Sequence, residues 1–368
     1  MTGTEMGARI PDPPWAKSYP PPRSRRVYAA AHVAAHPDGS IDWDATLAFR
    51  EHLWAHGFGL AEAMDTAQRG QGLSFAQASE LIRRSAARAA ELGAPIASGA
   101  GTDQLPPGEH PLAAITAAYA EQVERVEAAG SDVIVMASRA LAASARSAGD
   151  YVKVYTQIFK MARRPVMLHW LGDAFDPALR GYWGSQEFAT AADTVLDLIK
   201  RADGLVSGVK LSVLDAASEI ALRRRLPAGV SLYTGDDYHY AELIKGDADG
   251  HSDALLGAFA AITAPAAAAL QALDAGDLAG YDAAMGPTVA LSRLIFEPPT
   301  YYYKVGVAFL AWLNGFQPHF AMLGGLQARR SAEHLAGVFE LAAAAKALTR
   351  PALATRRMTE YLSRPDRP

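Results

Sequence analysis

Residues 204–212 read Gly-Leu-Val-Ser-Gly-Val-Lys-Leu-Ser, a short β-rich run with a lysine close to its end. Side chains alternate between the two faces of a strand. Val209 and Leu211 then form a face that suits packing against helices, while Gly208 and Lys210 point the other way. In a parallel barrel that second face is the interior, and Lys210 would lie near the carboxyl-terminal mouth, where barrel enzymes hold their active sites. Gly208 would leave room there for a ligand.

Other short apolar runs lie on both sides of this one, and longer Ala-rich helical patterns separate them. Such alternation is typical of repeated βα units on a parallel sheet. The expected strands are Val27–Ala34, Gly59–Met64, Pro95–Ala100, Asp132–Ala137, Pro165–Trp170, Leu205–Leu211, Val230–Thr234 and Ala254–Ala258. The expected helices include Phe75–Leu92, Pro111–Ala129, Asp150–Ala162 and Gln186–Lys200. This pattern predicts an α/β fold closed as a (β/α)8 TIM barrel, with a doubly wound open sheet as the alternative.

The strand pattern stops near Pro265, and the segments that follow are helical, with Gly and Pro between them. We expect these segments to form a helical C-terminal extension that packs on the barrel. They are Ala266–Leu273, Gly280–Leu294, Tyr301–Leu313 and Ala332–Leu348. The predicted organisation is a Pro-rich arm over residues 1–26, the barrel over 27–265 and the extension over 266–368.

Composition excludes several classes of function. The chain has 368 residues, of which 50% are hydrophobic and 20% charged, and its net charge of -4 provides no basic field for nucleic acid. The absence of cysteine excludes disulfides, thiolate nucleophiles and zinc–thiolate sites. The amino-terminal arm lacks the apolar segment of a signal peptide, and no apolar run is long enough to cross a bilayer. We therefore expect a soluble, cytoplasmic enzyme.

The chemistry available to Lys210 depends on its burial. A lysine with the reference pKa of about 10.4 is almost entirely charged at neutral pH, and burial lowers that pKa. The neutral amine attacks a ketone and forms a Schiff base. The alternative is a structural lysine paired with a buried carboxylate, and the strand pattern alone does not separate the two.

Acidic and imidazole side chains gather near the predicted carboxyl ends of several strands. They are Glu62, Asp65, His169, Asp173, Asp236, Asp237 and His239. Such groups hold a divalent metal in some barrel isomerases, but they also bind substrate hydroxyls or cap the helices that follow. The sequence has no His-Glu-x-x-His helix, EF-hand loop or complete dinucleotide-binding glycine motif. We therefore expect neither a metal nor a cofactor.

Several segments resemble, in the same order along the chain, motifs of the dihydrodipicolinate synthase/N-acetylneuraminate lyase superfamily of class I aldolases. They are Ala97–Thr102, Gly130–Val135, Pro165–Trp170, Gly208–Lys210, Gly235–Asp237, and Pro298-Pro299 with Lys304 and Gly315. The chain is identified as a divergent member of this superfamily over roughly Val27–Leu348. The resemblance implies that Lys210 forms the Schiff base and that His169 replaces the family's proton-relay tyrosine.

The chain departs from the family where the family binds the carboxylate of its keto acid. A Gly-Thr-Thr-Gly-Glu loop is replaced by residues 61–66, Ala-Glu-Ala-Met-Asp-Thr, in which only Thr66 supplies a hydroxyl. Glu62 and Asp65 would repel a carboxylate and would suit polyol hydroxyls or a cation. Trp170 replaces an asparagine, which indicates stacking on a sugar face or core packing. We expect a hydroxylated keto substrate, such as a keto-sugar or a sugar-derived keto acid.

The favoured hypothesis is a Schiff-base-forming lyase of the aldolase or dehydratase type, with Lys210 as nucleophile and His169 as acid/base. The expected substrate-binding residues are Glu62, Asp65, Thr66, Trp170, Asp236, Asp237 and His239. The alternatives are a divalent-metal-dependent sugar isomerase or epimerase and a barrel that only binds. The expected partner is a small-molecule substrate, with neither nucleic acid nor membrane.

A homodimer or homotetramer is also expected, for two reasons. The extension carries aromatic residues that look exposed in the helical pattern, and a monomer rarely leaves such a patch uncovered. These residues are Tyr301, Tyr303, Phe309 and Trp312. The family resemblance also implies an oligomer, which in most proteins has two-fold symmetry.

Overall fold

The structure is a computed structural model that describes residues 10–363. Its strands form one closed parallel barrel in which each strand pairs with the next along the chain and β8 pairs with β1. The strands are β1 (Val27–Ala30), β2 (Gly59–Glu62), β3 (Ile96–Ala100), β4 (Asp132–Val135), β5 (Val166–Leu171), β6 (Val206–Ser212), β7 (Ser231–Thr234) and β8 (Asp253–Leu256). The predicted (β/α)8 barrel is confirmed, and the open sheet is excluded because β1 and β8 share a ladder.

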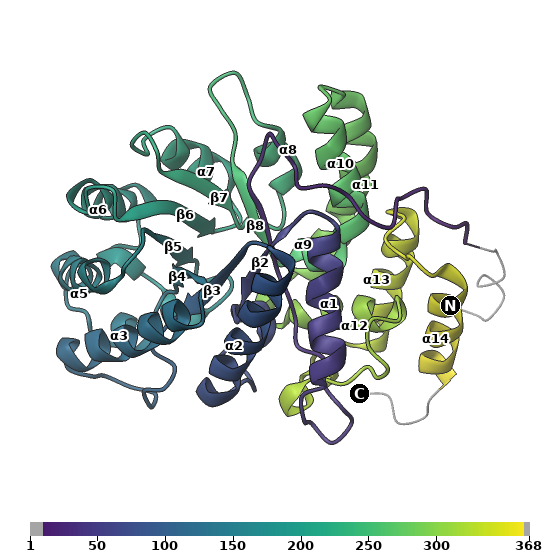
Figure 1. The fold of residues 1–368 in the computed structure, drawn as a ribbon, viewed down its shortest axis with the longest axis horizontal. Helices are drawn as coiled ribbons and strands as arrows, with labels where there is room; N and C mark the ends of the chain where they lie inside the picture. Colours follow the sequence, from purple (N-terminus) through teal and green to yellow (C-terminus); the bar gives the residue numbers. More distant parts are fainter. Residues whose placement is uncertain (1–9, 364–368) are drawn as a thin grey trace.

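Helices follow the strands in turn and surround the barrel (Figure 1). They are α1 (Trp43–Ala55), α2 (Phe75–Leu92), α3 (Leu112–Ala128), α4 (Arg139–Ser144), α5 (Ala148–Met161), α6 (Phe188–Arg201), α7 (Ala216–Arg223) and α8 (Tyr240–Lys245). Short polar side chains fix several helix starts. Asp42 caps α1, and Ser74 and Gln77 form a capping box at α2, so each satisfies amide groups that the helix leaves unpaired.

The chain beyond β8 is helical through residue 363 and lies beside the barrel (Figure 1). Its helices are α9 (Ala258–Ala261), α10 (Thr263–Asp274), α11 (Leu278–Ile295), α12 (Lys304–Leu313), α13 (Ala332–Ala344) and α14 (Pro351–Ser363). Helix α14 was not among the predicted helices, and residue 265 lies within the first turn of α10. None of the helices in residues 10–363 has the length and hydrophobicity needed to cross a membrane.

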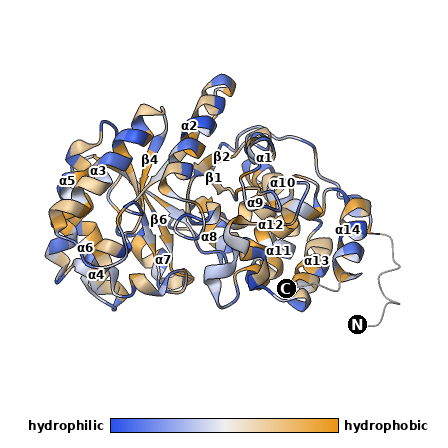
Figure 2. Cartoon of the chain, turned by 90° about the horizontal axis from the view of Figure 1, so that it is seen from below, coloured by the Kyte–Doolittle hydropathy of each residue, from blue (hydrophilic) through white to orange (hydrophobic). Residues whose placement is uncertain are grey.

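The barrel has two separate hydrophobic cores. The interior core consists of Ala30, Ala61, Met64, Ala97, Ile134, Met136, Met167, Tyr233 and Leu255, with Tyr28 against it. A larger core lies between the strands and the surrounding helices and continues into the extension. Figure 2 shows hydrophobic residues along the strands and through the helices of the extension, while polar residues colour the outer turns of several helices. Apolar side chains fill the middle of the interior, and Lys210 and His169 lie toward the carboxyl ends of their strands.

The described part of the amino-terminal arm, residues 10–26, packs against several helices rather than extending into solvent. Trp15 Nε1 donates a hydrogen bond to the carbonyl of Lys346 after α13 (2.7 Å). The backbone amide of Ser24 donates to the carboxylate of Asp274 at the end of α10 (2.8 Å). The arm thus links the extension to the first strand of the barrel.

Candidate active site

Lys210 lies on the interior face of β6, in register with His169 of β5 and Tyr233 of β7. The expectation that Gly208 leaves room for a ligand is wrong, because a Cβ at that position would lie 2.6 Å from the Tyr233 ring. Gly235, at the end of β7, gives the lysine its space. A Cβ there would lie 2.9 Å from Lys210 Cε.

The amine of Lys210 is buried without a partner. The residue is 7% exposed, and its Nζ makes no ion pair or hydrogen bond with any other residue in the described chain. Asp65 and Asp237 are the carboxylates whose negative charge acts on it. Burial outweighs them and holds the pKa of Lys210 below its ordinary value of 10.5. The structure therefore does not support the alternative of a lysine in a buried ion pair.

His169 presents a second unpartnered group beside the lysine. Both of its ring nitrogens are buried and have no hydrogen-bond partner within residues 10–363. Its Nδ1 lies 3.9 Å from Oδ2 of Asp65, an atom that is likewise buried and unpartnered. Burial, and then the charge of Lys210, holds the pKa of His169 well below 6.5. Both shifts favour the neutral imidazole.

His169 and Asp65 border a cavity of about 520 Å³ at the carboxyl ends of β2 to β5, while Lys210 itself is not among the residues that line it. The strand register places Lys210 next to His169, and neighbouring strands lie about 4.8 Å apart. The charged and hydroxyl-bearing residues of the cavity wall are Asp65, Arg69, Thr102, Asp103, Ser138, Arg139, His169 and Asp176. The cavity has the size of a small-molecule site.

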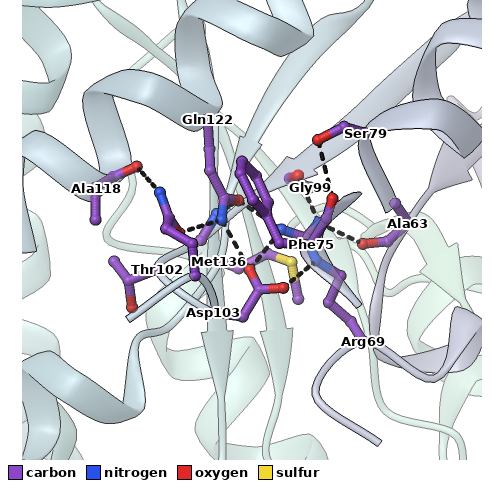
Figure 3. Close-up of polar contacts among 12 residues, drawn as sticks. Ala63, Arg69, Phe75, Ser79, Gly99, Thr102, Asp103, Ala118, Gln122 and Met136 are labelled. Carbon is purple, nitrogen blue, oxygen red and sulfur yellow. Dashed lines mark hydrogen bonds and ion pairs between the residues drawn. The ribbon is translucent and has the colours of Figure 1, made fainter. Parts of the chain in front are cut away.

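Arg69 holds this wall together (Figure 3). Its Nη1 donates to the carbonyls of Ala63 (3.1 Å) and Gly99 (3.0 Å). Its Nε and Nη2 donate to the two carboxylate oxygens of Asp103 (2.9 and 2.6 Å), and Nη2 also donates to Oε1 of Gln122 (2.5 Å). A guanidinium has five N–H donors, and all five are used here. Arg69 thus ties β2, β3 and α3 together and has no donor left for a substrate.

The two aspartates after β7 have different surroundings. Oδ1 of Asp237 accepts from the amide of Ala258 (3.0 Å), and burial raises the pKa of Asp237 to about 8. Asp236 instead closes a turn, since it accepts from the amides of Tyr238 (2.8 Å) and His239 (3.0 Å) and from His239 Nδ1 (2.9 Å). Asp236 and His239 do not line the 520 Å³ cavity. Asp236, whose oxygens are taken up by these contacts, has a structural role in the turn, while the role of His239 as a substrate ligand stays a prediction.

Glu62 lies on the outer face of β2 in a buried ion pair. Its carboxylate accepts from Nε and Nη2 of Arg50 (2.9 and 3.0 Å), from Ser85 Oγ (2.6 Å) and from the amide of Ala63 (2.8 Å). The prediction that Glu62 contacts substrate is wrong, because Ala61 is the residue of β2 that faces the interior. Of the two acids expected to repel a carboxylate, only Asp65 borders the cavity.

Trp170 also points away from the barrel interior. Its ring stacks on Phe188 of α6 with centroids 4.9 Å apart and planes 11° apart, and it meets Trp183 edge-on at 6.3 Å. The expected sugar-stacking role is therefore wrong. Trp170 follows His169 in an extended strand, so the two side chains occupy opposite faces.

The extension supplies side chains to the same region, although the motif that contains Lys304 gave no sign of this position. Tyr303 Oη and Thr66 Oγ1 share a hydrogen bond of 2.7 Å, so the Thr66 hydroxyl already has a protein partner. Lys304 Nζ donates to the carbonyl of Tyr301 (3.1 Å) and lies 4.7 Å from the Tyr303 ring centroid. Burial lowers the pKa of Lys304 to about 8. This second buried amine is covered by aromatic rings, in contrast to Lys210.

The acidic residues do not converge as a metal site would require. Within residues 10–363, no group of three or more His, Asp or Glu side chains is arranged to hold a metal ion. Glu62 and Asp236 are occupied by the contacts described above, and Asp173 pairs at 3.3 Å with Arg180.

Comparison with known proteins identifies a matching family model and a set of solved structures with a similar fold. A family model described as "Protein of unknown function (DUF993)" matches residues 4–364. No curated protein matches the chain.

Similar solved structures include dihydrodipicolinate synthases from three bacteria. The enzyme from Thermotoga maritima is 15% identical with a TM-score of 0.67, covering 89% of this chain and 100% of its own. The enzyme from Bacillus clausii is 17% identical with a TM-score of 0.67, covering 87% and 97%. The enzyme from Acinetobacter baumannii, solved with pyruvate, is 15% identical with a TM-score of 0.64, covering 88% and 99%. The barrel fold expected from the motif order is thereby confirmed.

Proposed function

We propose that this chain, which belongs to the DUF993 family, is a Schiff-base-forming lyase that acts on a keto substrate through Lys210. One observation carries the proposal. Lys210 lies buried on the interior face of a barrel strand, and its amine has no partner within residues 10–363. It is in register with His169, which lines a cavity of small-molecule size. Leaving a lysine amine unpaired in a protein interior costs stability, and active sites are where such a cost is retained.

The chemistry follows from the neutral amine. The Nζ lone pair adds to the ketone carbon of the substrate, and the former carbonyl oxygen leaves as water after protonation. The resulting iminium draws electrons from the neighbouring carbon. When a hydroxyl one carbon further out loses its proton, the carbon–carbon bond breaks, an aldehyde leaves and an enamine remains. Protonation of the enamine carbon and hydrolysis by water then release the second product and restore the amine.

His169 is the proposed proton acceptor for the hydroxyl. Its neutral imidazole has two free nitrogens and lines the cavity in register with the lysine. The carboxylate of Asp65 lies 3.9 Å from the imidazole Nδ1, a distance at which its charge would stabilise the imidazolium that forms. Burial and then the charge of Asp65 act most strongly on the pKa of Lys210, and Asp237 raises that pKa further when it is ionised.

The substrate class needs revision now that Glu62 is known to face outward. We retain a hydroxylated keto substrate, because Asp65 offers the cavity wall a carboxylate oxygen that has no partner within residues 10–363. Thr102 and Ser138 also line the cavity, but their hydroxyls share a hydrogen bond of 2.6 Å. A substrate carboxylate would meet repulsion from Asp65 but not from Glu62, which faces away from the cavity. No cluster of His, Asp and Glu side chains in residues 10–363 favours the metal-dependent isomerase.

Borohydride trapping tests the proposal. The protein is incubated with a panel of hydroxylated ketones and 2-oxo acids, reduced, and mapped by peptide mass spectrometry. We expect an adduct on Lys210, none in Lys210→Met, and an adduct retained in Lys245→Met, whose surface amine pairs with Asp282 at 2.7 Å. Turnover without a trappable adduct, or normal turnover by Lys210→Met, would refute the lyase.

A further inference from the structure

Two arginines border the cavity, and only one has donors to spare. Arg69 uses all five N–H groups on protein acceptors, as shown above. Arg139 begins α4, directly after the carboxyl end of β4, and its side chain is 45% exposed. It is therefore the arginine of this wall that a ligand reaches.

Arg139 is held in place from one side. Its Nε donates to Oδ2 of Asp176 at 2.5 Å, and Oδ1 of Asp176 is itself fixed by the amide of Ala178 (3.1 Å). The Tyr301 ring lies 6.0 Å from the guanidinium carbon, and Nη2 is 3.4 Å from the Tyr301 hydroxyl. These contacts orient the guanidinium plane and leave Nη1 without a partner among residues 10–363.

Gly70 keeps the free edge of this guanidinium open. A Cβ at Gly70 would lie 3.1 Å from Nη1 of Arg139, so any side chain there would cover the unpaired donor. Gly70 and Arg139 both line the cavity, together with His169. An unpartnered, oriented guanidinium nitrogen at the wall of a cavity is a binding group for a planar anion.

We propose that Arg139 binds a carboxylate group of the substrate whose ketone reacts at Lys210, so that the substrate is an oxo acid. This inference rests on the proposed function and narrows its substrate class. A carboxylate fits better than a phosphate. One guanidinium edge is available, its charge is already shared with Asp176, and the other ionised groups of this wall include Asp65 and Asp103. A dianionic phosphate would need more cationic partners than the wall offers.

The experiment compares matched probes. We use oxo acids in which none to three methylene groups separate the ketone from the carboxylate, each with its neutral primary amide. The first readout is the probe concentration that gives half-maximal borohydride-trapped adduct on Lys210. The second is calorimetric binding of the same probes to Lys210→Met, which does not require the Schiff base.

At least one acid is expected to outperform its amide by about tenfold or more in wild type, since a charge-assisted hydrogen bond contributes that much. Arg139→Gln should abolish the preference by weakening the acid and leaving the amide within about twofold, which is the change expected for loss of the charge alone. Arg146→Gln is the matched control, because Arg146 is a surface arginine paired at 2.7 Å with Glu109, and it should keep the preference.

The two hypotheses fail in different ways. If no probe forms an adduct but the acids still bind Lys210→Met better than their amides, and Arg139→Gln removes that difference, the lyase is refuted and the carboxylate site stands. If acids and amides are indistinguishable in both readouts, or if the preference survives Arg139→Gln, the carboxylate site is refuted.

Discussion

Lys210 and Lys304 are both buried amines whose pKa values are lowered by burial. Lys304 donates to the Tyr301 carbonyl and is covered by aromatic rings, which stabilise the ammonium form. Lys210 has only the more distant charges of Asp65 and Asp237. The difference in reactivity that we propose therefore comes from the immediate contacts of each amine, since a lowered pKa is common to both.

The charge of Asp237 should be visible in the pH dependence of trapping. Its negative charge stabilises the ammonium form of Lys210 and so raises the lysine pKa. Asp237→Asn removes that charge and keeps an oxygen for the Ala258 amide. The pH of half-maximal adduct formation should therefore move to lower values. Asp215→Asn, a change at the cap of α7, is the control that should leave the midpoint in place. A midpoint unchanged in Asp237→Asn would contradict the assigned coupling.

Gly235 offers a steric test of the same site. Gly235→Ala would bring a Cβ to 2.9 Å from Lys210 Cε and 2.1 Å from Ser212 Oγ. The lysine must then shift, and a displacement of the order of 1 Å in a reacting group costs about 10²-fold in rate. We expect trapping to slow by that order while the circular dichroism spectrum stays native. Gly286→Ala, where a Cβ meets nothing within 4 Å, is the control. Unchanged trapping in Gly235→Ala would place the reactive amine elsewhere.

The alternation of side chains along a strand predicts the positions of some site residues and not of others. Lys210 and His169 follow from alternation, because each is in step with the interior residues of its strand. Glu62 and Trp170 could have been excluded on the same rule, since Leu60 and Leu168 share their parity and lie in the outer core. Glu62 and Trp170 were predicted to contact substrate because they lie in segments that resemble the family motifs. Arg139, Tyr303 and Lys304 reach the site through loop geometry and tertiary packing, which no local pattern encodes.

At the scale of elements, strand positions were predictable because buried parallel strands are short apolar runs between helical patterns. The expected Gly59–Met64 and Asp132–Ala137 extend two residues beyond β2 and β4, where the side chains already belong to the mouth. Helix α2 begins and ends as predicted, at Phe75 and Leu92, because a capping box and Gly93 mark its ends. Helix α14 has only three apolar positions among its buried residues after Pro351, which makes a weak periodic signal.

Helix α7 carries a buried acid with a consequence for stability. Glu219 accepts from Ser252 Oγ (2.7 Å) through one oxygen, and its other oxygen has no hydrogen-bond partner within residues 10–363. Burial raises the pKa of Glu219 from 4.5 to about 8. The folded chain therefore binds a proton more tightly than the unfolded chain. The resulting stability is fully present below pH 4.5 and is lost as the pH rises toward 8.

Glu219→Gln removes this titration. Relative to the variant, the wild-type free energy of unfolding should fall between pH 5 and 8 with a slope of at most about 1.4 kcal/mol per pH unit. Urea unfolding at several pH values measures the difference. Glu187→Gln, at the exposed start of α6, should show no such trend. Parallel pH profiles for wild type and Glu219→Gln would mean that Glu219 is ionised in the folded protein.

At the scale of the whole molecule, the extension is part of the barrel's own packing. Phe309 and Trp312 are buried among Phe320 and Tyr361, so the exposed aromatic patch expected on these helices is a wrong prediction. The large hydrophobic residues exposed in the described chain are Leu92, Met161, Leu205 and Leu278. A homodimer or homotetramer stays a prediction that rests on the family resemblance, and light scattering at micromolar concentration tests it.

The barrel and the extension should unfold together. One hydrophobic core runs from β1 to α14, and buried hydrogen bonds cross between the two parts, including His32 Nε2 to Gln317 Oε1 (2.8 Å) and Thr66 to Tyr303 (2.7 Å). If the barrel and the extension unfold as one unit, loss of a hydrogen bond between them lowers a single free energy of unfolding that both parts share. Gln317→Leu should therefore lower the stability by about 1–3 kcal/mol, because it leaves the buried His32 nitrogen unsatisfied. Far-ultraviolet circular dichroism and tryptophan fluorescence should report the same shifted transition. Two separated transitions, or a shift confined to one probe, would show that the helical extension folds independently of the barrel.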